Sequence, residues 1–228
     1  MSHFRIANHK YIHYGFVVEK LLHGCLKQRC LLLDAGCGKG GSMRLVPKNV
    51  GFVGVDILRA NLVAAKFLRK NLSYVVADLT WLPFIEGAFG GELSVNVVEH
   101  VDDKTAVIGE LARVTHEGGF FIGCSTNLLN PVLWLDVKLP MLLKPLVMKF
   151  APSHHYYDRH SRFSPSSLTS TLNATGYQMD YLALLGCVLF NKEKQPWFAY
   201  LWILFDKLTR KKPLLYLKEV MVWKATRV

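Results

Sequence analysis

The chain is organised around the glycine-rich stretch Leu31-Leu-Leu-Asp34-Ala-Gly36-Cys-Gly38-Lys-Gly40-Gly41. The three leucines predict a short buried strand that ends at Asp34, and the glycines that follow allow the backbone to bend sharply. In a parallel α/β sheet, the turn after the first strand opens into a helix whose free N–H groups face the crevice at the strand ends. The stretch therefore predicts a nucleotide-binding turn.

Asp34 indicates which kind of nucleotide the turn binds. The spacing Gly36-x-Gly38-x-x-Gly41 fits a dinucleotide fingerprint, so the glycines alone leave nicotinamide and flavin cofactors open. A carboxylate at the strand tip favours a cationic ligand over a pyrophosphate. The pattern Asp-x-Gly-x-Gly-x-Gly resembles motif I of the class I S-adenosylmethionine-dependent methyltransferases. The resemblance implies that the aminoacyl end of S-adenosylmethionine lies near Asp34, Ala35, Gly36, Gly38 and Gly40.

Two further acids are predicted to end the next two strands. Asp56 closes the strand 51–57 and lies where a strand-end carboxylate can accept hydrogen bonds from both ribose hydroxyls, in NAD enzymes as well. Asp78 closes the strand 73–79 within Ala-Asp-Leu-x-x-Leu-Pro-Phe, which resembles the methyltransferase segment that receives the adenine amino group. Dinucleotide fingerprints do not require this segment, so the methyltransferase is favoured. Ile57 and Leu79, which follow the two acids, are assigned to the cofactor site as well.

The fourth strand, 91–97, leads into Asn96-Val-Val-Glu99-His100. Glu99-His100 resembles part of the Glu-x-x-Glu-His metal site of the O-methyltransferases of ubiquinone biosynthesis. Here Asn96 replaces the first glutamate, and the loss of a hard anionic ligand argues against a metal. We therefore expect no metal, and we assign Asn96 to the cofactor site.

The resemblance is continuous over residues 31–126 and implies the fold. We expect a Rossmann-like α/β domain with a seven-stranded mixed sheet, strand order 3-2-1-4-5-7-6, an antiparallel last strand, and helices on both faces. Residues 1–228 form a single methyltransferase domain in this interpretation. Its parts are an N-terminal helical cover (1–30), a cofactor-binding core (31–126) and two substrate-cap insertions (127–162 and 188–215).

Composition limits the class of protein and its surroundings. The 228 residues are 51% apolar, enough to bury one core, and five cysteines without a CxxC pair argue against a disulfide framework. We find no signal peptide and no apolar run long enough to span a membrane, so a cytoplasmic protein is expected. The net charge of +11 lies mainly in the C-terminal part, which carries +8 over residues 127–228.

The second insertion predicts either a protein cap or a membrane contact. Its segment 196–205 is apolar on all sides and is followed by Lys207, Arg210, Lys211 and Lys212. Such a helix is buried under protein or lies in a bilayer interface with its cations near lipid phosphates. We therefore expect a small apolar or lipid-like methyl acceptor and peripheral contact with the inner face of an anionic membrane. The basic residues are interleaved with aliphatic ones, which argues against nucleic acid.

Methyl transfer from a sulfonium is an in-line displacement, so a general base is needed only when the acceptor must lose a proton. The candidate bases are His100 and, in the first insertion, His155 and His160. Two alternatives remain. The first is an NAD-dependent oxidoreductase, and the second is a non-catalytic membrane-associated module that retains the cofactor pocket.

Overall fold

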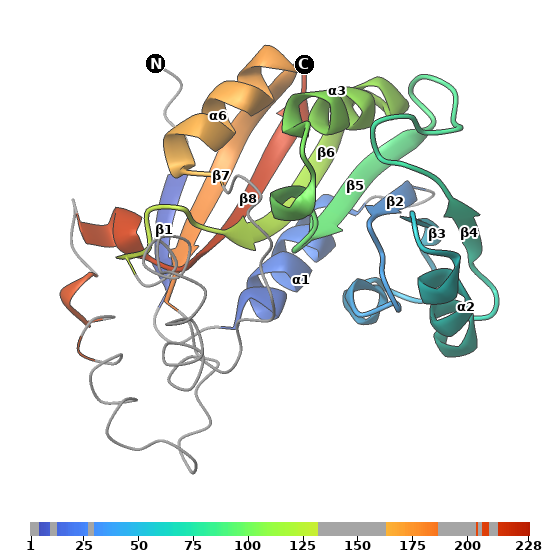
Figure 1. Ribbon diagram of the computed structural model, residues 1–228, viewed down its shortest axis with the longest axis horizontal. Helices are drawn as coiled ribbons and strands as arrows, with labels where there is room; N and C mark the ends of the chain where they lie inside the picture. Colours follow the sequence, from blue (N-terminus) through green and yellow to red (C-terminus); the bar gives the residue numbers. More distant parts are fainter. Residues whose placement is uncertain are drawn as a thin grey trace, which may run out of the picture.

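The computed structural model describes residues 5–9, 13–26, 30–131, 163–186, 204, 207–209 and 214–228. Its centre is an eight-stranded sheet with the order β1-β7-β8-β6-β5-β2-β3-β4 (Figure 1). The strands are β1 (Arg5–His9), β2 (Leu31–Ala35), β3 (Gly51–Asp56), β4 (Ser73–Val76), β5 (Phe89–Val95), β6 (Thr115–Thr126), β7 (Tyr177–Leu185) and β8 (Val220–Arg227).

The order confirms the predicted topology and adds one strand to it. Without β1, the strands read 3-2-1-4-5-7-6, and β8 is antiparallel to both of its neighbours, β6 and β7. The prediction of seven strands missed β1, which pairs in parallel with the outer edge of β7. A five-residue edge strand gains its hydrogen bonds only from its neighbour, so its own sequence carries little signal.

Helices cover both faces of the sheet. They are α1 (Tyr14–Cys25), α2 (Arg59–Leu68), α3 (Lys104–Val114) and α6 (Pro165–Ala174), with the 3-10 turns η1 (Ser42–Leu45), η2 (Val98–His100) and η3 (Leu214–Leu217). Leucine, isoleucine and valine side chains of α3 and α6 pack in the core on one face, and those of α1 and α2 pack with Met43 of η1 on the other. Figure 1 shows α3 and α6 together at the top and α1 and α2 lower in the view.

Local sequence signals set the ends of the helices on the first face. The side chain of Asp103 caps α3 by accepting a hydrogen bond from the backbone N–H of Ala106. Ser164 and Ser167 form a capping box at the start of α6, with Pro165 in its first turn. Each cap bonds a backbone N–H three residues further along the chain. In contrast, the helix expected after the glycine-rich turn is reduced to η1.

The parallel strands bring the predicted site residues to one edge of the sheet. Asp34 of β2 lies opposite Gly54 of β3 and Leu93 of β5. Because β3 pairs in parallel with β4, the chain after Val76 leaves the sheet at the same edge as Asp56. The glycine-rich turn, Asp56 and the segment that contains Asp78 therefore lie around the carboxyl ends of neighbouring strands, where α/β sheets bind ligands.

Candidate cofactor site

The glycine-rich turn is held against β3 by two backbone hydrogen bonds. The N–H groups of Gly36 and Cys37 both donate to the carbonyl oxygen of Val55, at 2.9 and 2.8 Å. Gly36 has φ of +77°, and a Cβ added to it would lie 2.4 Å from a methyl carbon of Val97. Only glycine fits here, because a side chain would be strained and would also clash. The turn is thereby fixed in a shape that the sequence predicted.

Asp34 is a buried carboxyl group with one oxygen unsatisfied. Its side chain is 1% exposed, and Oδ2 accepts a hydrogen bond from the hydroxyl of Ser42 in η1. Oδ1 has no hydrogen-bond partner among the described residues. Burial raises the pKa of Asp34 to about 7, the Ser42 hydroxyl offsets part of this rise, and the neighbouring Asp56 charge adds to it. A buried carboxyl group of this kind is stabilised in its ionised form by a cation.

Asp56 links the turn to the start of α2. Its Oδ2 accepts from the backbone N–H of Gly38 at 2.9 Å, and its Oδ1 accepts from the N–H of Leu58 at 2.9 Å and the amide of Asn61 at 3.0 Å. A carboxylate offers about four acceptor positions, so one position of Asp56 is left for a ribose hydroxyl. Contact of Asp56 with both ribose hydroxyls stays a prediction from the sequence.

The loop beside Gly38 leaves room for a ligand. A Cβ added to Gly38 would meet nothing within 4 Å, and Gly38 has φ of +53°. Ile57, directly after Asp56, is 64% exposed, which is unusual for an isoleucine at a strand end. An apolar side chain exposed beside a backbone cradle can pack against the flat face of a nucleoside.

Asp78 is exposed, and its side chain is oriented by Thr80, two residues later in the turn. Its Oδ1 accepts from both the backbone N–H and the hydroxyl of Thr80, each at 2.8 Å. The backbone hydrogen bond from Thr80 lowers the pKa of Asp78, and the bond from the Thr80 hydroxyl adds to this effect. Leu79 is buried beneath the turn. Asp78 is thus an ionised acceptor, as a contact with an amino group requires.

Asn96 lies at the end of β5 in a left-handed conformation, with φ of 56°, that few residues other than glycine adopt. Its side-chain amide donates to the hydroxyl of Tyr14 in α1 at 3.4 Å, and its side-chain oxygen accepts from the thiol of Cys124 at 3.6 Å. Strained residues of this kind cluster at functional sites. Asn96 therefore connects α1, the predicted cover, to the strand ends.

The predicted bases are not brought together by the described part of the chain. His100 is an exposed residue at the end of η2, whereas His155 and His160 lie outside the described residues. The preceding residue, Glu99, is buried, and its carboxylate accepts from the backbone N–H of Thr126 at 3.4 Å. No group of three or more histidine, cysteine, aspartate or glutamate side chains that could hold a metal occurs among the described residues.

Sequence reasoning missed three residues that shape the site. The hydroxyl of Ser42 donates a hydrogen bond to Asp34, and the hydroxyl of Tyr14 accepts one from Asn96. The methyl groups of Val97 fill the space where a Cβ of Gly36 would lie. The position of Ser42 just after the glycines could have suggested the first contact. The other two join segments far apart in the sequence and carry no local signal.

Taken together, the residues fit S-adenosylmethionine. The unsatisfied oxygen of Asp34 suits an ammonium group, the space beside Gly38 admits a ligand against the backbone, and Asp56, Ile57 and Asp78 offer contacts for a nucleoside. A dinucleotide would place its pyrophosphate near the buried Asp34, where the negative charges repel each other.

Comparisons with known proteins agree with this geometry. Residues 33–123 match a family model described as a methyltransferase domain. Ajmaline N-methyltransferase of Rauvolfia serpentina is 34% identical over 99 residues, which cover 40% of this chain and 34% of the relative. Tocopherol O-methyltransferase of Arabidopsis thaliana is 37% identical over 108 residues, covering 42% of this chain and 31% of the relative. The chain thus spans about a third of the length of these curated relatives.

The fold is also shared with solved structures over most of the chain. A SAM-dependent methyltransferase from Methanosarcina mazei superposes with a TM-score of 0.65 at 18% identity, covering 91% of this chain and 97% of that one. At this identity the likeness shows the fold alone. Residues 33–123 thus match a methyltransferase domain, and the chain as a whole has the Rossmann-like fold of the solved methyltransferases.

Proposed function

We propose that this chain binds S-adenosylmethionine and transfers its methyl group to a small apolar or lipid-like acceptor. The observation that carries the proposal is the buried Asp34, whose Oδ1 has no partner among the described residues while its Oδ2 is held by Ser42. An ion buried without a partner costs several kcal/mol. A ligand with a cationic group at this point offsets that cost, and S-adenosylmethionine carries an ammonium group at its aminoacyl end.

The chain's own part in the reaction is alignment and the exclusion of water. The cofactor supplies an already activated methyl group when bound. Gly36 and Cys37 fix the turn against Val55, so that the backbone that receives the cofactor does not need to reorganise. Tyr14 holds Asn96 from α1, which places a helix next to the strand ends where an acceptor would enter. Such preorganisation is the main demand of an in-line displacement.

The acceptor class rests on composition and on the names of relatives. Tocopherol, named in one relative, is largely apolar. The two apolar, basic insertions that we expect to shape the acceptor pocket lie mostly outside the described residues, as does most of the segment 196–212. Among the described residues, no helix is long and apolar enough to cross a membrane. A cytoplasmic enzyme that meets the inner face of an anionic membrane remains our proposal.

The general base is proposed from the sequence alone. His100, His155 and His160 would serve only for an acceptor that loses a proton, such as a phenol. The exposed His100 lies one residue after the buried Glu99, at the edge where β5 and β6 end. Replacing each histidine by glutamine and measuring kcat against pH would separate a base, which shifts the profile, from a residue that only binds.

Calorimetry with two cofactors tests the proposal. S-adenosylhomocysteine should bind the wild type and should bind Asp34→Asn at least 10-fold more weakly, since a hydrogen bond to a charged group contributes about 1.5–3 kcal/mol. The exposed Glu117→Gln is the matched control. Binding of NADH without binding of S-adenosylhomocysteine would favour the oxidoreductase and end the proposal.

The acceptor itself can be found by labelling. Incubation with methyl-labelled S-adenosylmethionine below saturation and a lipid extract, fractionated by polarity, should give a labelled apolar product with the wild type and at least 10-fold less of it with Asp34→Asn. Cofactor binding without label in any lipid or metabolite fraction would instead support a non-catalytic module.

A further inference from the structure

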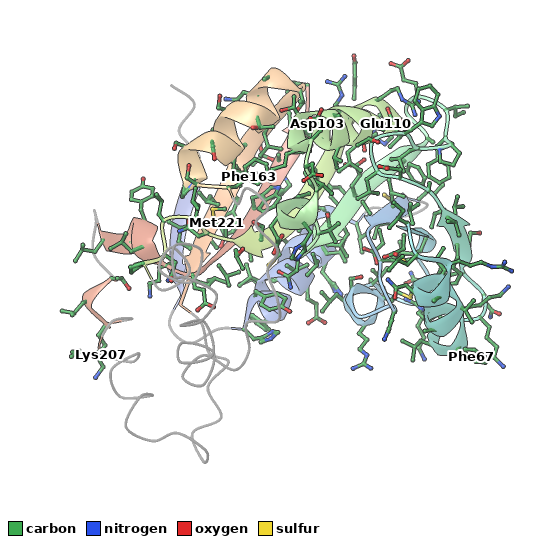
Figure 2. The ribbon with its side chains drawn as sticks, viewed as in Figure 1. Phe67, Asp103, Glu110, Phe163, Lys207 and Met221 are labelled. Carbon is green, nitrogen blue, oxygen red and sulfur yellow. The ribbon has the colours of Figure 1, made fainter. Side chains whose placement is uncertain are left out.

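The outward face of α2 is apolar, although it faces away from the core. Leu62 and Ala65 are the buried side chains of α2 and pack against the sheet. With 3.6 residues per turn, the opposite face is formed by Ala60, Val63, Ala64 and Phe67. Val63 is 51% exposed and Phe67 is 76% exposed. Phe67 lies at the lower right periphery of the molecule in Figure 2. Surface helices normally turn polar residues outward, so this face is inverted.

A row of cations borders this apolar face. Arg59 and Lys66 are seven residues apart, so they lie along one side of α2, and Lys70 follows two residues after the helix ends. All three are exposed. Residues 57–76 contain no acid that would neutralise them. An apolar stripe bordered by a basic stripe is the pattern of a helix that lies in the interface of an anionic bilayer.

A basic cavity adjoins the C-terminal end of α2. It has a volume of about 330 Å³ and is lined by Arg44, Lys48, Arg69 and His23, with Glu19 as its acid. Arg69, the C-cap of α2, donates from Nη1 to the carbonyl oxygens of Met43 and Val46, each at 3.1 Å, which fixes its guanidinium group at the cavity wall. Arg69 thus joins the C-terminal end of α2 to a recess that is large enough for a phosphate group.

We propose that α2 and this cavity form a docking surface for an anionic phospholipid membrane. Val63 and Phe67 enter the interfacial region, Arg59, Lys66 and Lys70 lie at the level of the lipid phosphates, and the cavity faces the headgroups. The charge decides in favour of lipid over a second copy of this chain, because two copies would bring like charges together. The surface would give the proposed enzyme access to a lipid-borne acceptor, but it rests on α2 and its surroundings and not on methyl transfer.

Vesicle sedimentation tests the surface with the full chain. The wild type should bind vesicles of phosphatidylcholine with phosphatidylglycerol, more weakly at high salt, and should not bind phosphatidylcholine alone. Since each cation near such a surface contributes about 1 kcal/mol, the variant Arg59→Gln/Lys66→Gln/Lys70→Gln should lose roughly 100-fold in partition coefficient. Val63→Glu/Phe67→Glu should lose at least about 10-fold.

Control variants separate this surface from the rest of the molecule. Val228→Glu adds one glutamate at an exposed valine at the C-terminus, which Figure 1 places far from α2, and should bind like the wild type. Lys207→Gln changes a cation of the second insertion, and Figure 2 shows Lys207 at the other end of the molecule from Phe67. Circular dichroism and S-adenosylhomocysteine binding confirm that each variant is folded.

Three results would overturn the proposal. The first is equal recovery of the wild type with neutral and anionic vesicles. The second is loss of binding on Lys207→Gln but not on the α2 substitutions. The third is a dimer, seen by light scattering, that Val63→Glu/Phe67→Glu dissociates while vesicle binding is absent. None of these three results depends on S-adenosylhomocysteine binding. Failure of the proposed membrane surface is therefore distinguishable from failure of the proposed cofactor site.

Discussion

Replacing Asp34 by asparagine should stabilise the cofactor-free protein and at the same time weaken cofactor binding. Asparagine has nearly the same shape, and its oxygen can still accept the hydrogen bond from Ser42. What it removes is a charge that the fold buries without a partner for Oδ1. The two effects have opposite signs because the charge is costly in the empty site and useful only when a cation is present.

The magnitude follows from the pKa. Burial raises the pKa of Asp34 from 3.8 to about 7 in the folded chain, roughly three units. Each unit corresponds to about 1.4 kcal/mol, so ionised Asp34 destabilises the empty fold by about 4 kcal/mol at pH 8. Between pH 4 and 7 the folded state binds more protons than the unfolded state. The free energy of unfolding therefore falls as pH rises through this window and is level above it.

Urea denaturation at pH 5 and pH 8 is the assay. Asp34→Asn should gain stability over the wild type, and the gain should be larger at pH 8 by roughly 2–3 kcal/mol, because the wild type is mostly protonated at pH 5. The exposed Glu117→Gln should show no such change. Saturating S-adenosylhomocysteine should narrow the gap in stability at pH 8 by at least about 1.4 kcal/mol, the equivalent of 10-fold weaker binding to Asp34→Asn. A stability difference that is the same at both pH values, or unweakened binding by Asp34→Asn, would refute the reasoning.

Three further predictions concern the backbone, the core and a helix end. Gly36→Ala should abolish S-adenosylhomocysteine binding in calorimetry and cost at least about 2 kcal/mol of stability, because φ is +77° and the new Cβ lies 2.4 Å from Val97. The control Gly41→Ala, which has open space around its Cβ and φ of −61°, should leave this binding intact. Burial raises the pKa of Glu92 from 4.5 to about 8. Between pH 5 and 8, the free energy of unfolding in urea should therefore fall by roughly 3–4 kcal/mol more for the wild type than for Glu92→Gln. The same pH dependence for both proteins would contradict this. Ser164→Ala removes the cap of α6 and should lower the melting temperature by the equivalent of about 1 kcal/mol, whereas an unchanged value would mean that the cap is replaced by water.

Local patterns in the sequence determined the frame of the fold and predicted where its cofactor site lies. The glycine-rich turn, Asp56 and Asp78 each follow a short apolar run, and such runs predict strands because the strands of a parallel sheet are buried on both faces. The starts of α3 and α6 depend on local signals, since the side chains of Asp103 and Ser164 bond backbone groups only three residues away. The resemblance to a known family then placed these elements in the correct order.

Only the tertiary structure decided the properties that depend on contacts between distant segments. The strand β1 exists through its pairing with β7, more than 170 residues later, and the sequence gives no sign of that pairing. Asp34 could be recognised as a strand-end acid, but its raised pKa comes from the packing that excludes water and from Asp56 on the next strand. The apolar residues of α2 satisfy a helical period, yet which of them face the sheet and which face outward is fixed by how the helix packs. Hydrogen bonds between neighbours in the sequence are encoded locally, whereas burial is a property of the assembled chain.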